Sequence, residues 1–158
     1  MNNSRFVEAL DLCEQVLAVF QDYRILGTIA RAEEVLGFVQ EAVTHYQQAL
    51  ELCPEEELQE KAPILNNMAL LFADKGDIPR AIALWEQSLE IKEQIGDVKG
   101  KAATLANMAY VVGKTGDKAR QLELNLQAAL ALAQVRAYGD LVRVTMGCWV
   151  THFLPTAI

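Results

Sequence analysis

The octapeptide LNNMALLF at residues 65–72 recurs 40 residues later as LANMAYVV at residues 105–112. The pair Gly76-Asp77 recurs at the same distance as Gly116-Asp117. A further copy, 39 residues before the first, keeps the same small and apolar positions, namely Leu26, Ile29, Ala30, Gly37, Ala42, Tyr46, Ala49 and Leu50. Agreement at so many positions with nearly one spacing indicates an internal repeat, and such a repeat decides the whole architecture.

Each copy reads as two helices joined by a turn. In residues 65–72 the apolar side chains fall at i, i+3, i+4 and i+7, which is the spacing of one buried helical face. Gly76 follows, and glycine readily adopts the left-handed conformation that ends a helix. We therefore expect antiparallel helix pairs in which the small Ala69 and Ala81 allow close approach, while Trp85 fills the space toward the next pair.

These positions resemble the tetratricopeptide repeat, a pattern of large apolar, small and aromatic residues at fixed offsets. The spacing of 39–40 residues exceeds the basic length of about 34 residues and is similar to the longer repeats of kinesin light chain and of Pins-type adaptors. The resemblance implies an all-α fold, a right-handed superhelix (α-solenoid) of antiparallel helix pairs with about three units and a flanking half-repeat. A plain helical bundle with coincidental internal similarity is the alternative.

The repeats divide the chain, which we interpret as a single domain over residues 1–158, into five segments. We expect residues 1–20 to form the second helix of a partial repeat. Repeats 1, 2 and 3 follow at residues 23–57, 58–97 and 98–138. Residues 139–158 should form the first helix of an incomplete repeat or a cap.

Three features depart from the family pattern. Glu33 stands where repeat 1 should bury an aromatic side chain, and Leu122 stands where repeat 3 should place a small one, so both positions should pack less regularly. Repeat 3 is interpreted as slipping by one residue, so that its second helix buries Leu122, Leu126, Ala129 and Leu130. The extra residues around 94–100 are expected to lengthen the second helix and the connection after it.

Composition and charge restrict the class of protein. The net charge is −7 and basic residues form no cluster, which argues against nucleic acid as a partner. No run reaches the ~20 apolar residues that a membrane-spanning helix needs, and the N-terminus lacks the apolar stretch of a signal peptide. The widely spaced Cys13, Cys53 and Cys148 fit neither a disulfide framework nor a metal site. We expect a soluble, cytoplasmic protein.

No catalytic or metal-binding motif is evident. The two histidines, His45 and His152, lie far apart, and His45 is interpreted as a surface or boundary residue. Gly113-Lys114-Thr115 resembles the end of a phosphate-binding loop, but Met108 stands where that loop requires a glycine. The sequence therefore predicts a non-enzymatic protein with no cofactor and no metal.

The resemblance implies that the first helix of each repeat lines a concave groove. The residues of those helices outside the buried face are Arg24, Thr28 and Arg31 in repeat 1, Asn66, Asn67 and Leu70 in repeat 2, and Asn107, Tyr110 and Lys114 in repeat 3. Asn67 and Asn107 are equivalent, and an amide offers both donors and an acceptor to a peptide backbone. Kinesin light chain and related adaptors carry similar asparagines, which hold peptide backbones. The alternative is exposed asparagine inherited by duplication.

The leading functional hypothesis is a protein–protein interaction module that binds a peptide segment of a partner in this groove, with Arg24, Arg31 and Lys114 supplying positive charge. The alternative is a ligand- or peptide-sensing regulatory domain that controls an effector. The C-terminal segment Val144–Leu154 is apolar on nearly every side. It is predicted to pack on residues 121–135 and to present an exposed face for self-association, or for cover by further chain.

Overall fold

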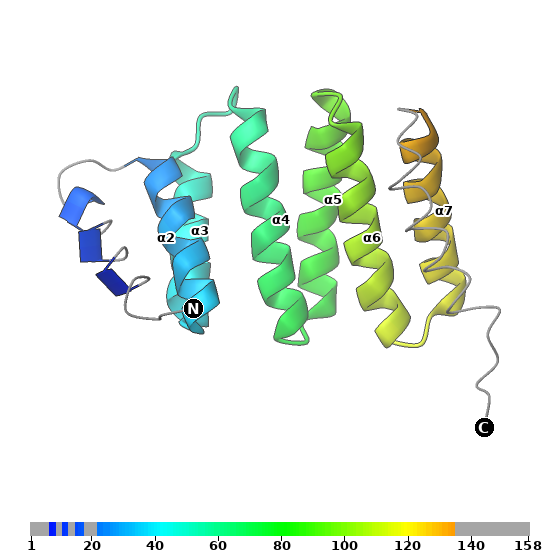
Figure 1. The fold of residues 1–158 in the computed structure, drawn as a ribbon, viewed down its shortest axis with the longest axis horizontal. Coiled ribbons are helices and arrows are strands. Elements are labelled where there is room, and N and C mark those ends of the chain that lie inside the picture. Colours follow the sequence, from blue (N-terminus) through cyan, green and yellow to red (C-terminus); the bar gives the residue numbers. More distant parts are fainter. Residues whose placement is uncertain (1–6, 9–10, 13–14, 18–21, 135–158) are drawn as a thin grey trace. The chain divides into compact units, whose positions relative to one another are not determined.

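The computed structural model describes residues 7–8, 11–12, 15–17 and 22–134, and every regular element in these ranges is an α-helix (Figure 1). The helices with defined ends are α2 (Tyr23–Leu36), α3 (Val39–Leu52), α4 (Leu58–Asp74), α5 (Ile78–Gln94), α6 (Val98–Lys114) and α7 (Lys118–Gln134). The predicted all-α fold is therefore confirmed. Among these helices none is long and apolar enough to cross a membrane.

Contacts between Cα atoms divide the chain into a first unit, residues 1–88, and a second unit, residues 89–158. The division falls inside α5. The first unit thus contains α2, α3, α4 and most of α5, and the second contains the end of α5 with α6 and α7.

In the first unit, α2 packs against α3, and both helices contact α4. The Asp22 carboxylate accepts a hydrogen bond of 2.8 Å from the Arg24 N–H and caps the start of α2. Gly37 ends the helix with a φ of 86°, a conformation in which a side chain would be strained. Farther along, the Ser88 hydroxyl donates to the Ala62 carbonyl oxygen over 2.8 Å and joins α5 to α4.

In the second unit, α6 packs against α7. The buried side chains of α6 are Ala102, Thr104, Leu105, Met108, Ala109, Val111 and Val112. The last turns of α5 are tied to α6 by two polar contacts. The Lys92 ammonium donates to the Thr104 hydroxyl over 2.6 Å, and Lys101 pairs with Glu93 at 2.9 Å.

The additional length of repeats 2 and 3 lies in their helices. Each of α4, α5, α6 and α7 has 17 residues, whereas α2 and α3 have 14. The connection at 95–97 is as short as those at 75–77 and 115–117. The expectation of a lengthened connection after Gln94 is therefore wrong, because one extra turn in each helix accounts for the longer repeat.

The predicted one-residue slip in repeat 3 is also wrong. Leu126 and Leu130 are 54% and 65% exposed, and Leu122 is half-buried. The spacing of 40 residues continues instead, and the buried series of α7 is Gln121, Leu124, Ala128, Ala129, Ala131 and Leu132. Leucines every fourth residue suggested a buried face, but they lie on the other side of the helix.

The unbroken register places the large Gln121 where repeat 2 has the small Ala81. Space for it comes from Gly113, which corresponds to Ala73 in repeat 2. A methyl group at position 113 would overlap the side-chain amide of Gln121. The absence of a side chain at Gly113 thus makes room for the larger Gln121 between α6 and α7.

The departure at Glu33 buries a carboxylate in place of the expected aromatic ring. Glu33 is 5% exposed, and its carboxylate lies 2.7 Å from the Nδ1 atom of the half-buried His45 on α3. A polar pair between α2 and α3 therefore occupies the position that Phe72 fills in repeat 2.

Several predictions concern residues outside the described ranges. Of the partial repeat predicted at residues 1–20, residues 7–8, 11–12 and 15–17 are described, and they are helical. The predicted C-terminal helix at residues 139–158, with its face for self-association, lies outside the described residues, as do Cys13, Cys148 and His152.

Candidate functional site

A groove in the first unit lies between α2 and α4, the first helices of repeats 1 and 2. It encloses about 530 Å³, within the range of about 300–1,000 Å³ typical of ligand sites. The residues that line it are Tyr23, Arg24, Gly27, Thr28, Arg31, Ala32, Val35, Tyr46, Glu60, Pro63, Ile64 and Asn67. Four of the predicted site residues, Arg24, Thr28, Arg31 and Asn67, are therefore in one place.

Tyr46 and Asn67 line this groove, and Glu34 extends them into a polar cluster. The Tyr46 hydroxyl donates to the Glu34 carboxylate over 3.1 Å, and the side chain of Asn67 acts on the same hydroxyl to lower its pKa. Burial raises the pKa of Tyr46, and the negative charge of Glu34 raises it further. Burial likewise raises the pKa of Glu34, although the hydrogen bond from Tyr46 opposes that shift. The cluster thus joins α2, α3 and α4 through groups that water only partly solvates.

The two arginines on the rim of the groove differ in their freedom. Arg24 is held by a 3.0 Å ion pair to Asp22 and lies over the Tyr23 ring, 5.3 Å from its centroid. The exposed Arg31 forms no ion pair with the described residues, although its charge acts on Glu34 and Tyr46. Arg31 is therefore the cation better placed to bind an incoming carboxylate.

The remaining predicted residues have other positions. The Thr28 hydroxyl donates to the Arg24 carbonyl oxygen over 2.8 Å, so its proton is already engaged. Asn66 and Leu70 are half-buried on α4 and do not line the groove. The Asn66 amide donates to the Asn67 side-chain oxygen over 3.5 Å, a long hydrogen bond.

The predicted residues of repeat 3 all lie in the second unit, on α6. Asn107 is half-buried, as Asn67 is. Tyr110 is 61% exposed, and the Lys114 ammonium lies 4.3 Å from the centroid of its ring. This cation–π pair presents an aromatic ring and a positive charge together on an exposed part of α6.

Sequence reasoning missed the part that Glu34 and Tyr46 play in the site. Tyr46 was identified only as a buried residue of the repeat. A signal was present, however, because repeat 2 places Trp85 at the equivalent position, and only a tyrosine there carries a hydroxyl.

Comparisons with known proteins agree with this fold. Residues 22–94 match the family model described as Tetratricopeptide repeat. The Photosystem I assembly protein Ycf3 of Acaryochloris marina (strain MBIC 11017) is 32% identical over 90 residues, which is 57% of this chain and 49% of that protein. The chain thus spans about half the length of this curated relative.

Three solved structures resemble the chain in fold. BtubC (BKLC) from P. vanneervenii has a TM-score of 0.71 at 15% identity and covers 96% of this chain and 65% of its own. Aspartyl phosphate phosphatase F from Bacillus subtilis has a TM-score of 0.79 at 12% identity, with coverages of 94% and 43%. A Rap protein complexed with Competence and Sporulation Factor has a TM-score of 0.67 at 16% identity, and the match covers 94% of this chain and 49% of that protein. At such identities the likeness is one of fold alone.

Proposed function

We propose that this chain, whose residues 22–94 match the tetratricopeptide repeat family, is a non-enzymatic interaction module that binds an extended segment of a partner protein. The binding site in this proposal is the groove between α2 and α4 of the first unit.

The observation that carries the proposal is the polar cluster along the groove. The Asn67 amide has two donors and an acceptor, and its described hydrogen bond, a long one from Asn66, engages only the acceptor oxygen. What remains matches the alternating donor and acceptor of a peptide backbone. Tyr46, which lines the same groove, is already fixed by its hydrogen bond to Glu34 before a ligand arrives.

Arg31 supports recognition of a carboxylate next to that backbone. Its guanidinium is exposed and offers a planar pair of donors that fits a carboxylate. It lines the same groove as Asn67. A bound segment would then present main chain to Asn67 and an acidic side chain or chain terminus to Arg31.

The test begins with linear peptides selected on the wild-type chain from a displayed random library. Asn67→Ala should weaken their binding by about 1–3 kcal/mol, because a peptide group in the groove loses its partner. Arg31→Ala should weaken those peptides that carry a carboxylate. The matched controls are Gln87→Ala and Lys75→Ala, which remove an exposed amide and an exposed charge outside the groove. Equal affinity for wild type and both groove variants would move the site elsewhere.

Asn67→Ala also has a cost in stability. Loss of its polar contacts with Asn66 and Tyr46 should lower the free energy of unfolding by about 0.5–1.5 kcal/mol. Thermal melts of the variant beside wild type separate this effect from the loss of affinity, since binding is compared at a temperature where both chains are folded.

A second candidate function is a sensing domain that changes conformation on binding and controls an effector. The fold likeness to a Rap protein complexed with Competence and Sporulation Factor favours it. Hydrogen exchange distinguishes the two functions. An interaction module should show protection by a selected peptide at α2 and α4 only, whereas a sensor should show altered exchange in α7 as well.

A cytoplasmic location is part of the proposal. Among the described residues, Cys53 is a buried free thiol, and burial raises its pKa. This is the behaviour of a small apolar core residue in a reducing compartment.

A further inference from the structure

The outer face of α7 differs from the corresponding faces of α3 and α5. Leu126 and Leu130 are more than half exposed. The residues at their positions in the two earlier repeats are all exposed and polar or acidic: Gln47 and Glu51 on α3, and Glu86 and Glu90 on α5. Repeat 3 has therefore replaced a solvated face with a leucine face, formed by Leu126 and Leu130.

The same unit buries a lysine where the other repeats bury apolar side chains. Lys92 is 7% exposed, and its equivalents are the buried Cys53 in repeat 1 and the buried Leu132 in repeat 3. Its ammonium donates to Thr104, which itself replaces the buried Ile64 of repeat 2. Burial disfavours the charged form and lowers the pKa of Lys92. Because a buried ammonium carries a desolvation cost and the other repeats place apolar side chains here, Lys92 is a candidate functional residue.

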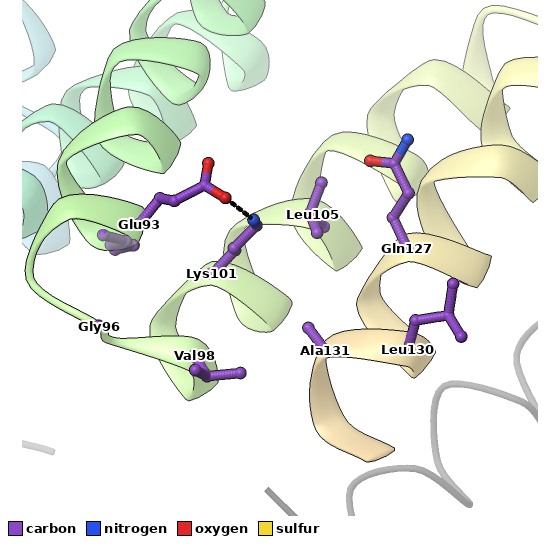
Figure 2. Close-up of a pocket in the computed structure, with 9 residues that line it drawn as sticks. Glu93, Gly96, Val98, Lys101, Leu105, Gln127, Leu130 and Ala131 are labelled. Carbon is purple, nitrogen blue, oxygen red and sulfur yellow. Dashed lines mark hydrogen bonds and ion pairs between the residues drawn. The ribbon is translucent and has the colours of Figure 1, made fainter. Parts of the chain in front are cut away.

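Lys92 lines a groove of about 430 Å³ formed by the end of α5 with α6 and α7, a volume within the range of about 300–1,000 Å³ for ligand sites. Figure 2 shows Lys101 paired with Glu93 on one side of this groove and Gln127, Leu130 and Ala131 of α7 on the other. The Glu93 side chain is 71% exposed, so this ion pair is weak and easily exchanged. Leu130 belongs both to the groove and to the leucine face.

The charge of the second unit differs from that of the rest of the chain. Residues 89–134 contain six basic and five acidic side chains, whereas residues 22–88 contain five basic and twelve acidic ones. In a chain of net charge −7, the surface of the second unit is the one that an acidic segment approaches without repulsion.

From these observations we propose that the leucine face of α7 and the adjacent groove containing Lys92 form a second binding surface, whose partner is an acidic amphipathic helix of another protein. The apolar face of that helix packs on Leu126 and Leu130. A carboxylate on its edge enters the groove and binds the Lys92 and Lys101 ammonium groups, displacing Glu93 from Lys101. This surface is separate from the groove of the first unit and does not depend on the function proposed for it.

The spacing on α7 favours a helical occupant. Leu126 and Leu130 are one helical turn apart, about 6 Å along the axis. That is the distance between residues i and i+4 of a facing helix, and rows of i and i+4 side chains interdigitate in the commonest mode of helix packing. The Lys92 ammonium has three donors, and its hydrogen bond to Thr104 is the one formed with the described residues, so it retains capacity for a carboxylate.

The experiment uses two dye-labelled helical peptides with leucines at i and i+4, one with glutamates and the other with glutamines at the flanking positions. Fluorescence anisotropy should show saturable binding of the glutamate peptide to the wild-type chain and binding about 10- to 100-fold weaker for the glutamine peptide. Lys92→Met should weaken the glutamate peptide by about the same factor while leaving the chain folded by circular dichroism. The double variant Leu126→Glu/Leu130→Glu, which carries the residues found at 86 and 90, should abolish binding.

Two controls locate the site. Lys75→Met removes one exposed lysine of the first unit, and Arg31→Ala alters the other groove, so both should bind the glutamate peptide as wild type does. The proposal is overturned if the wild-type chain fails to bind that peptide, or if Lys92→Met and the double leucine variant bind it as tightly as wild type does. It is overturned as well if Arg31→Ala lowers the affinity for the peptide as much as those two variants do. It is also overturned if light scattering shows a wild-type dimer that the leucine variant converts to a monomer, because a second copy then occupies the face.

Discussion

The two units build the same kind of helix pair from different side chains at equivalent positions. The position that holds the buried aromatics Tyr46 and Trp85 in the first unit is Asn125 in the second, where it is half-buried. The pair Ala73 and Ala81 becomes Gly113 and Gln121. The repeat therefore keeps the glycine turn that joins its helices, while the bulk and charge of the side chains between them vary.

The largest expected effect tests whether the position of Trp85 and Asn125 contributes to stability in the first unit but not in the second. Trp85→Ala removes a fully buried ring and should lower the free energy of unfolding by about 3–5 kcal/mol. Asn125→Ala, the equivalent change in the second unit, should cost no more than about 0.5 kcal/mol. Urea denaturation followed by circular dichroism measures both. Similar losses in the free energy of unfolding for the two variants would show that this position contributes equally to stability in both units.

A smaller effect concerns the contact between Gly113 and Gln121, where the missing side chain of one residue makes room for the other. Gly113→Ala places a methyl group against the Gln121 amide, and Gln121→Ala leaves space above the glycine. The double variant restores the pair of alanines found in repeat 2. A double-mutant cycle should therefore give a favourable coupling of about 1–2 kcal/mol between the two alanines. Additive effects of the single changes would mean that Gln121 simply turns away from a methyl group at 113.

Lys92 offers a comparison with the apolar residues at its position in the other repeats. Lys92→Met keeps the length of the side chain without the charge and should raise the free energy of unfolding by about 1 kcal/mol at pH 7. Because burial lowers the pKa of Lys92 from its ordinary value of 10.5, the cost of its charge is fully present below the lowered pKa. That cost disappears as the pH rises toward 10.5, so the advantage of methionine should shrink.

Thermal melts of Lys92→Met and wild type at pH 7 and pH 10 measure this difference at each pH. A Lys92→Met chain that is less stable than wild type at pH 7 would contradict the reading, since the ammonium would then contribute to the fold through its bond to Thr104.

The sequence predicted the helices well because their signals are local and repeated. Ala69 recurs in all three repeats, and Ala81 and the ring of Trp85 have counterparts in repeat 1. All three side chains are fully buried as expected. The second helix of repeat 3 was misread because three leucines at intervals of four imitate a buried face. Only the unbroken spacing from Asp77 to Asp117 would have shown that Gln121, and not Leu122, continues the series.

The candidate site was less accessible to sequence reasoning because its contacts join separate helices. The sequence places Arg31 and Asn67 on first helices, and the groove indeed brings them together. It does not reveal that Tyr46 bonds to Glu34 and lines the same groove as Asn67, since this depends on how α3 packs against α2 and α4. Nor does it reveal that Arg24 is paired with Asp22 whereas Arg31, also exposed, forms no ion pair with the described residues.

The smallest expected effect tests whether the leucine face contributes to the fold of the second unit. Leu126→Glu/Leu130→Glu should change the free energy of unfolding by no more than about 0.5 kcal/mol, because both side chains are more than half exposed and leave no cavity. Leu124→Ala on the same helix should cost about 2–5 kcal/mol, because that side chain is buried. Urea denaturation of both variants supplies the measurement. If the glutamate variant is destabilised as much as Leu124→Ala, another part of this chain covers the leucines and they are not available to a partner. If the glutamate variant is as stable as wild type, Leu126 and Leu130 contribute nothing to the stability of the described helices. The presence of leucines where repeat 2 has Glu86 and Glu90 then indicates binding.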